Sequence, residues 1–151
     1  MRLMARALFA LTFGIFVLAQ PAMANERYGT QKVVYHINED GGEDSKGYMG
    51  AMRNIQNHIN AVGAGNLEVV VVMHGNGVGL VMNAKKDDRL QTAIGSLKSQ
   101  NVAFHVCNNT LEGRNINYGD DLYDVWEEDI VPSGVAELSR LQAMGYTYIK
   151  P

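Results

Sequence analysis

One cysteine and two histidines are the residues of this sequence whose types and positions could do chemistry. Each stands at or just after the end of a short apolar run of chain, and they are Cys107, His74 and His36. A cysteine thiolate is a nucleophile, and an imidazole exchanges protons near neutral pH. If the fold brings the three side chains together, they could carry out nucleophilic chemistry at sulfur.

Cys107 is the only cysteine among 151 residues, so it cannot form an intramolecular disulfide. It is therefore a buried and inert core residue, a residue capped by another molecule, or a reactive thiol. A thiol becomes nucleophilic at a helix N-terminus or beside a cationic histidine. Asn109 or Thr110 could cap a short helix whose amide groups point back toward the sulfur.

The histidines allow a structural and a chemical interpretation. His74 could orient or protonate a substrate on Cys107, or hydrogen-bond the loop that follows its strand. His36 could be a strand histidine whose hydrogen bonds are satisfied within the fold. His105 lies two residues before Cys107 and shares its face of the strand, so it could tune the thiol or be buried under a helix. His58 falls within a helical pattern, where we expect it to be solvated.

The sequence predicts no cofactor and no metal ion. Residues Gly75–Gly79 form a glycine-rich turn, but the third glycine comes one residue too early for the dinucleotide fingerprint, and no P-loop lysine follows. We interpret these glycines as a tight turn. His36, His74 and Cys107 are acceptable zinc ligand types, but no local ligand spacing supports a zinc site. The acidic stretch 120–129 is interpreted as a solvated face.

Short apolar runs rich in β-branched residues alternate with segments of helical period along the chain. The expected strands are residues 32–37, 67–73, 102–106, 130–131 and 146–149. The first expected helix covers residues 45–62, with an apolar stripe of Met52, Ile55, Ile59 and Val62. The second is capped by Asp87 or Asp88 and has Leu90, Ile94 and Leu97 at helical spacing. The third is capped by Ser133 and has Val135, Leu138 and Leu141 at helical spacing. Residues 108–118 read as a loop with one helical turn.

This alternation predicts an α/β fold, a three-layer α/β/α sandwich around a parallel sheet. Ligands of such sheets bind beyond the carboxyl ends of the strands. His36, His74 and Cys107 occupy equivalent positions on three strands. If those strands are neighbours, the three residues line one rim.

The first 24 residues have the three parts of a secretory signal peptide. They contain Arg2 and Arg6, an apolar run over 7–19, and the small-x-small site Ala22–Ala24. We expect cleavage to leave one domain, residues 25–151, in the periplasm. Without the two arginines, 11 of the 13 basic residues face 16 acidic ones, a net charge of about −5. That charge argues against nucleic acid and anionic membranes as partners.

Four blocks of the chain together resemble the DsrE/DsrF-like family. They are Val69–Gly75 with its glycine-rich turn, Phe104–Leu111, Ile130–Leu138 and Gly145–Lys150. The resemblance covers essentially all of residues 25–151. It implies a five-stranded parallel sheet in the order 4-3-2-1-5, which would place the strands of Cys107, His74 and His36 side by side.

The resemblance also implies a function and an assembly. In the better-known members, a cysteine equivalent to Cys107 carries sulfane sulfur as a persulfide and lies near a subunit boundary of a trimer or hexamer. Those members are cytoplasmic, whereas this chain resembles an exported member, so its donor and acceptor would differ from theirs.

Two hypotheses follow. The first is a sulfur carrier or sulfurtransferase-like protein that accepts sulfur on Cys107 from a small sulfur compound or a donor protein, with His74 or His36 tuning the thiol. The second is a non-catalytic, oligomeric small-molecule-binding module in which Cys107 packs in the core. Both hypotheses predict a homo-oligomer, a trimer or larger. The irregular acidic segment contains three aromatic residues, and aromatic residues in such a segment favour a subunit interface. They are Tyr118, Tyr123 and Trp126.

Overall fold

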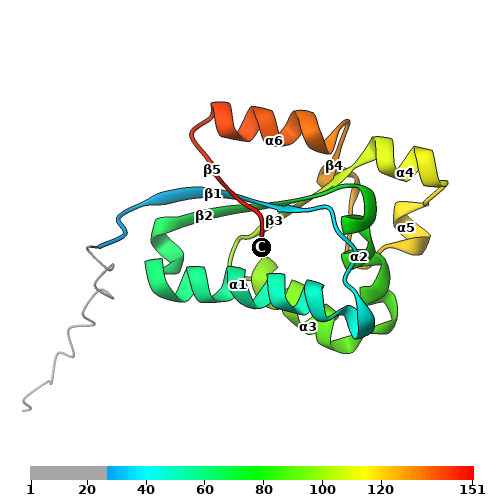
Figure 1. The fold of residues 1–151 in the computed structure, drawn as a ribbon, viewed down its shortest axis with the longest axis horizontal. Coiled ribbons are helices and arrows are strands. Elements are labelled where there is room, and N and C mark those ends of the chain that lie inside the picture. The colour runs from blue at the N-terminus through cyan, green and yellow to red at the C-terminus, as the bar shows by residue number, and fades with distance from the viewer. Residues whose placement is uncertain (1–26) are drawn as a thin grey trace, which may run out of the picture.

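Five parallel strands form the central sheet of the protein (Figure 1). The computed structural model describes residues 27–151, and the expected signal peptide lies outside them. The strand order is β4-β3-β2-β1-β5, as the resemblance implied. The strands are β1 (Gln31–Ile37), β2 (Leu67–Met73), β3 (Ala103–Cys107), β4 (Ile130–Val131) and β5 (Thr147–Ile149).

Helices cover both faces of the sheet, which confirms the predicted α/β fold. In Figure 1, α1 and α3 lie together on one face and α6 lies on the other. Shorter helices gather at one end of the sheet, beyond the carboxyl ends of the central strands. The helices are α1 (Lys46–Val62), α2 (Gly79–Asn83), α3 (Asp88–Lys98), α4 (Asn108–Arg114), α5 (Tyr118–Asp121) and α6 (Gly134–Ala143).

The alternation of side chains along β2 explains why both faces are covered. Val69, Val71 and Met73 point into the larger core, which α1 and α3 complete. Val70 and Val72 pack on the other face with Leu138 and Leu141 of α6 and with Tyr146. Because β2 has apolar side chains on both faces, it must lie in the middle of a covered sheet.

The helix caps and apolar stripes were largely predictable. The Asp87 side chain accepts a hydrogen bond from the backbone N–H of Arg89, and Ser133 accepts one from Ala136. The predicted stripes of α1 and α3 are buried. In α6, Leu138 is buried, but Val135 is 65% exposed because it lies in the first turn, on the side away from the sheet.

The segment after β3 is more helical than we predicted. Residues 108–114 form α4, and α5 follows with Asn117 as its N-cap. Cys107 itself occupies the N-cap position of α4, in place of Asn109 or Thr110. The extended backbone of the last strand residue leads directly into the helix, so no separate capping residue intervenes.

His58 differs from its predicted solvated state. Its Nε2 lies 2.8 Å from Gln31 Oε1 and its Nδ1 lies 2.9 Å from the hydroxyl of Tyr35. The side chain is half-buried between α1 and β1, where it satisfies two polar groups at the sheet surface.

The glycine-rich turn after β2 is tight, as predicted. Residues Gly75–Val78 form a single 3-10 turn, η3, which leads into α2. A Cβ on Gly77 would overlap the carbonyl group of Ile37, so only glycine allows η3 to pack against the end of β1. Within residues 27–151, no helix is long and apolar enough to cross a membrane.

Candidate functional site

The three residues singled out in the sequence lie at the carboxyl edge of the sheet on adjacent strands. His36 is the penultimate residue of β1, His74 directly follows β2, and Cys107 is the last residue of β3. The strand register aligns Ile37 with Met73, and Met73 with Val106. The sheet therefore brings the two imidazoles and the thiol to one rim, at the position where parallel α/β sheets bind ligands.

The two histidines at the rim form a pair. Their Nε2 atoms lie 2.7 Å apart, and their rings stack with centroids 4.7 Å apart. His36 Nδ1 lies 2.6 Å from the hydroxyl of Tyr148 on β5. One Nε2 must donate to the other, so at least one of the two rings is neutral. Tyr148, His36 and His74 form a continuous hydrogen-bonded chain along the rim.

Partial burial keeps this pair neutral. Burial is the largest cause that lowers the pKa of His36, and the charges of His74 and Lys150 lower it further. Burial also lowers the pKa of His74. Both imidazoles are therefore uncharged at neutral pH, able to accept or pass on a proton.

Gly134, the first residue of α6, joins the thiol to the histidine pair. A Cβ at Gly134 would lie 3.0 Å from the Cβ of His74 and 3.2 Å from the Cβ of Cys107. The N-terminus of α6 thus contacts both side chains through one residue that has no side chain. The backbone N–H of Gly134 is one of the groups that lower the pKa of Cys107.

The groups around the Cys107 sulfur favour its thiolate form. Burial is the largest influence and raises the pKa of Cys107, but hydrogen bonds from the N–H groups of Gly134, Thr110 and Asn109 and from the Thr110 hydroxyl together outweigh it. The pKa of Cys107 therefore lies below its ordinary value. Only 5% of the residue is exposed, so a reactant must reach the sulfur through the rim.

Thr110 connects the turn that follows His74 to the residue that carries the thiol. Its hydroxyl accepts a hydrogen bond of 2.9 Å from the backbone N–H of Gly75 and also helps to lower the pKa of Cys107. The residue after His74 is thereby held against the first turn of α4. This link sets the position of the imidazole relative to the sulfur.

His105 lies under α6, as one of the two sequence interpretations proposed. Its Nδ1 lies 3.0 Å from Oε1 of Glu137, which also accepts hydrogen bonds from Arg140. The Arg140 guanidinium, then His105, hold the pKa of Glu137 below its usual range against the effect of burial. This cluster ties the first turn of α6 to β3 and so supports the position of Gly134.

Sequence reasoning identified the three rim residues but missed Tyr148 and Gly134, and it considered Thr110 only as a helix cap. The strand order alone could have pointed to Tyr148, because it places β5 beside β1 and aligns Tyr148 with Val34, on the same face as His36. No pattern in the sequence signals the contact of Gly134. Among residues 27–151, no three His, Cys, Asp or Glu side chains are grouped closely enough to hold a metal ion.

A three-layer α/β/α domain with a thiol at the carboxyl end of its third strand is the class of protein that this fold and site define. The sequence profile of the DsrE/DsrF-like family matches residues 31–151. The chain therefore belongs to the DsrE/DsrF-like family.

Two solved structures share the fold. One is a protein of unknown function, MTH1491 from Methanobacterium thermoautotrophicum, with 28% sequence identity over 80% of this chain and 99% of that chain and a TM-score of 0.66. The other is the ychN protein from E. coli, with 18% identity over 81% of this chain and 100% of that one and a TM-score of 0.63. No curated protein matches the chain.

Proposed function

We propose that this protein is a sulfur carrier that accepts sulfane sulfur on Cys107. The observation that carries the proposal is the position of Cys107 at the N-terminus of α4 and against Gly134, the first residue of α6, where neighbouring N–H groups lower the pKa of its thiol. Backbone N–H groups stabilise a thiolate, and the thiolate is the nucleophilic form of cysteine. Membership of the DsrE/DsrF-like family supports the same function.

The proposed step leaves the oxidation states unchanged overall. The Cys107 thiolate attacks the outer sulfur of a donor R–S–S–H, a new S–S bond forms between that sulfur and the Cys107 sulfur, and the S–S bond of the donor breaks. The bonding electron pair leaves with R–S⁻, so the products are a Cys107 hydropersulfide and a thiolate. The N–H groups that held the thiolate remain available to the terminal sulfur of the persulfide.

The histidine pair is suited to pass a proton from solvent to the leaving thiolate. His74 contacts the same glycine as Cys107 and is hydrogen-bonded to His36, which in turn contacts Tyr148. Tyr148 is 43% exposed, so this chain runs from the rim to solvent. In this proposal His74 and His36 assist the transfer, while the sulfur of Cys107 makes the bond.

The proposal includes export and assembly. A mature domain in the periplasm would receive sulfur from a donor of that compartment, either a small sulfur compound or a protein. A homo-oligomer would cover the aromatic side chains of the acidic segment, where Trp126 is 61% exposed and Tyr118 is 37% exposed. Burial of such aromatic surface commonly stabilises subunit interfaces.

The competing function is a small-molecule-binding module in which Cys107 only packs. Alkylation with iodoacetamide separates the two, because a carrier needs a thiolate that is reachable in the folded protein. We expect Cys107 of the native protein to react at pH 7 at least as fast as an ordinary cysteine thiol. Reaction only after unfolding in urea would favour the binding module.

A further inference from the structure

A cavity lined by residues outside the rim lies at the end of α4 that is far from the thiol. It has a volume of about 640 Å³ and opens between the β1–α1 loop, α2 and the end of α4. That volume is within the range of small-molecule sites. Its wall includes one cation and one anion, Arg114 and Asp40, together with polar and apolar side chains that include Tyr48, Asn76 and Met82.

Both charges in this cavity retain open hydrogen-bonding positions. Arg114 donates to Asn76 Oδ1 through one Nη2 bond of 2.9 Å, and within residues 27–151 its other N–H groups have no acceptor. Asp40 accepts one bond, from the backbone N–H of Gly42, on Oδ1 alone. Arg114 and Asp40 act in opposite directions on the pKa of Tyr48, which burial raises, so both charges lie near this phenol.

The floor of the cavity is built around Tyr48. Its hydroxyl donates a 2.7 Å hydrogen bond to the backbone oxygen of Asn76. A Cβ on either Gly41 or Gly79 would overlap the Tyr48 side chain, so the ring is held between two glycines. The floor is therefore fixed before any ligand arrives.

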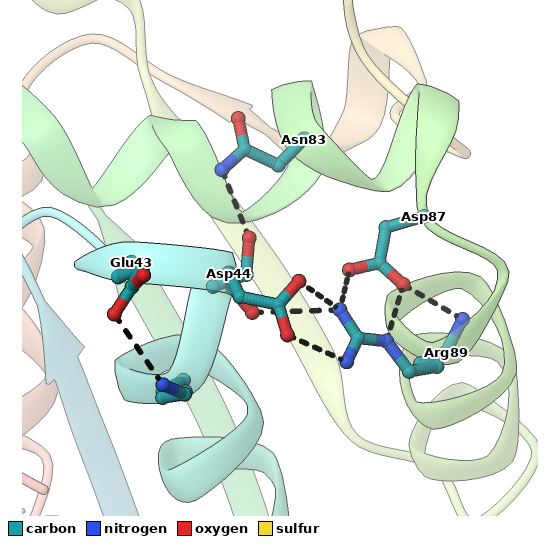
Figure 2. Close-up of polar contacts among 7 residues, drawn as sticks. Glu43, Asp44, Asn83, Asp87 and Arg89 are labelled. Carbon is teal, nitrogen blue, oxygen red and sulfur yellow. Dashed lines mark hydrogen bonds and ion pairs between the residues drawn. The ribbon is translucent and has the colours of Figure 1, made fainter.

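A polar network holds the loop that borders the cavity. Figure 2 shows Arg89 between two carboxylates, donating to Asp44 at 2.9 and 3.1 Å and to Asp87 at 2.8 Å. Asn83, which also lines the cavity, donates to the hydroxyl of Ser45 at 3.1 Å. Asp44 and Ser45 have left-handed φ angles of 55° and 54°, and these contacts hold them there.

The cavity and the thiol are joined by two elements. Cys107 caps α4 and Arg114 ends it, so their backbone positions lie about 10 Å apart along the helix axis at about 1.5 Å per residue. The turn after β2 borders both places, because Gly75 is bonded to Thr110 beside the sulfur and Asn76 is bonded to Tyr48 and Arg114. A ligand of two or three extended residues, at about 3.3–3.6 Å each, has the length to reach from one to the other.

We propose that this cavity binds a zwitterionic thiol peptide, with a carboxylate at Arg114 and an ammonium at Asp40, whose persulfide delivers its outer sulfur to Cys107. This inference rests on the proposed sulfur-carrier function and names the class of donor. The transfer is Cys107–S⁻ plus R–S–S–H giving Cys107–S–S–H plus R–S⁻, where R is the peptide. A planar guanidinium pairs with a carboxylate through two parallel hydrogen bonds, which is why Arg114 is the anchor.

Binding is tested first with a probe that cannot exchange sulfur. S-methylglutathione is titrated into the full chain and followed by calorimetry, with its diethyl ester as the ligand that lacks free carboxylates. We expect Arg114→Met to weaken binding at least tenfold and Asp40→Asn to weaken it less. Arg53→Met, at an exposed arginine of α1 outside the cavity, is the matched control and should bind as the wild type does. Absence of binding at millimolar probe, or equal binding by Arg114→Met and Arg53→Met, would overturn the inference.

Transfer is tested with glutathione persulfide and with inorganic polysulfide as alternative donors. We expect Arg114→Met to lower the ratio of the peptide-donor rate to the polysulfide rate at least tenfold. If polysulfide loads Cys107 but this ratio is unchanged, the sulfur carrier stands and the donor site is overturned. If the probe binds but neither donor loads Cys107, the sulfur-carrier function falls, and the role of the cavity as a donor site falls with it.

Discussion

Gly134 packs directly against Cys107, although 26 residues separate them in the sequence. A Cβ on this glycine would lie 3.2 Å from the Cβ of Cys107, and the backbone N–H of Gly134 helps to lower the pKa of the thiol. The contact joins the first turn of α6 to the end of β3. Because the α6 N-terminus carries partial positive charge, it favours the thiolate.

Gly134→Ala is expected to make the thiol less reactive. The added methyl group would press on the Cβ atoms of Cys107 and His74, which cannot rotate away, so α6 must shift and the N–H bond to sulfur lengthens. We expect the pKa of Cys107 to rise and the alkylation rate at pH 7 to fall severalfold. Overpacking of this kind also costs about 1–3 kcal/mol of stability.

Gly113→Ala is the matched control for this substitution. Gly113 lies in α4, and a Cβ there has nothing within 4 Å. Because alanine favours helix over glycine by about 1 kcal/mol, this variant should be as stable as the wild type or slightly more so. Equal alkylation rates for Gly134→Ala and Gly113→Ala would show that the Gly134 contact does not activate the thiol.

The histidine pair should make stability depend on pH below neutrality. Burial lowers the pKa values of both His36 and His74, so protons bind the unfolded chain more tightly than the folded one. Stability is then full above the unfolded pKa of about 6.5 and falls as the pH drops below it, by up to about 1.4 kcal/mol for each unit of difference in pKa. Urea unfolding midpoints between pH 7.5 and 5.0 measure this loss.

Replacing both rings by glutamine, in His36→Gln with His74→Gln, should make this loss smaller. It should not abolish the loss, since burial also lowers the pKa of His58. A pH dependence in the double variant as steep as in the wild type would show that the pair is not the source.

The order of elements could be predicted because each helix has apolar residues at helical spacing and the strands are short apolar runs. The run Leu67–Met73 is apolar at nearly every position, and such a run fits only a strand covered on both faces. The rim positions of His36, His74 and Cys107 follow from the ends of such runs together with the strand order.

The contacts within the site could not be predicted in the same way. The bonds from Gly134 and Thr110 to sulfur depend on how two helices meet at the sheet edge, and no local pattern encodes this. The length of the helix over residues 108–114 was also underestimated, since Asn108, Asn109 and Gly113 are poor helix formers. There the strand end and the packing of Leu111, which is 3% exposed, decide the structure.

We expect the mature protein to be a trimer or larger. Trp126 is 61% exposed in the single chain, and an interface would remove its ring from water. Multi-angle light scattering at micromolar concentration gives the mass directly. Trp126→Ala should shift the assembly toward smaller species by weakening the interface, while a monomeric wild type would refute this prediction.

Export should produce a mature chain that begins at Asn25. The basis is the apolar run that ends before Ala22–Ala24, with its small-x-small cleavage pattern. Intact-mass measurement on protein released from the periplasm tests the cleavage site. Recovery of the full-length chain from the cytoplasm would contradict it.

The mass of the mature protein after exposure to a sulfane donor tests the central claim most directly. Incubation with polysulfide at pH 7 should add one sulfur atom to Cys107, and dithiothreitol should remove it. Cys107→Ser should show no gain while keeping its fold, and His74→Ala should show the gain at a lower rate. A wild-type protein that gains no mass from polysulfide or thiosulfate would contradict the sulfur-carrier account.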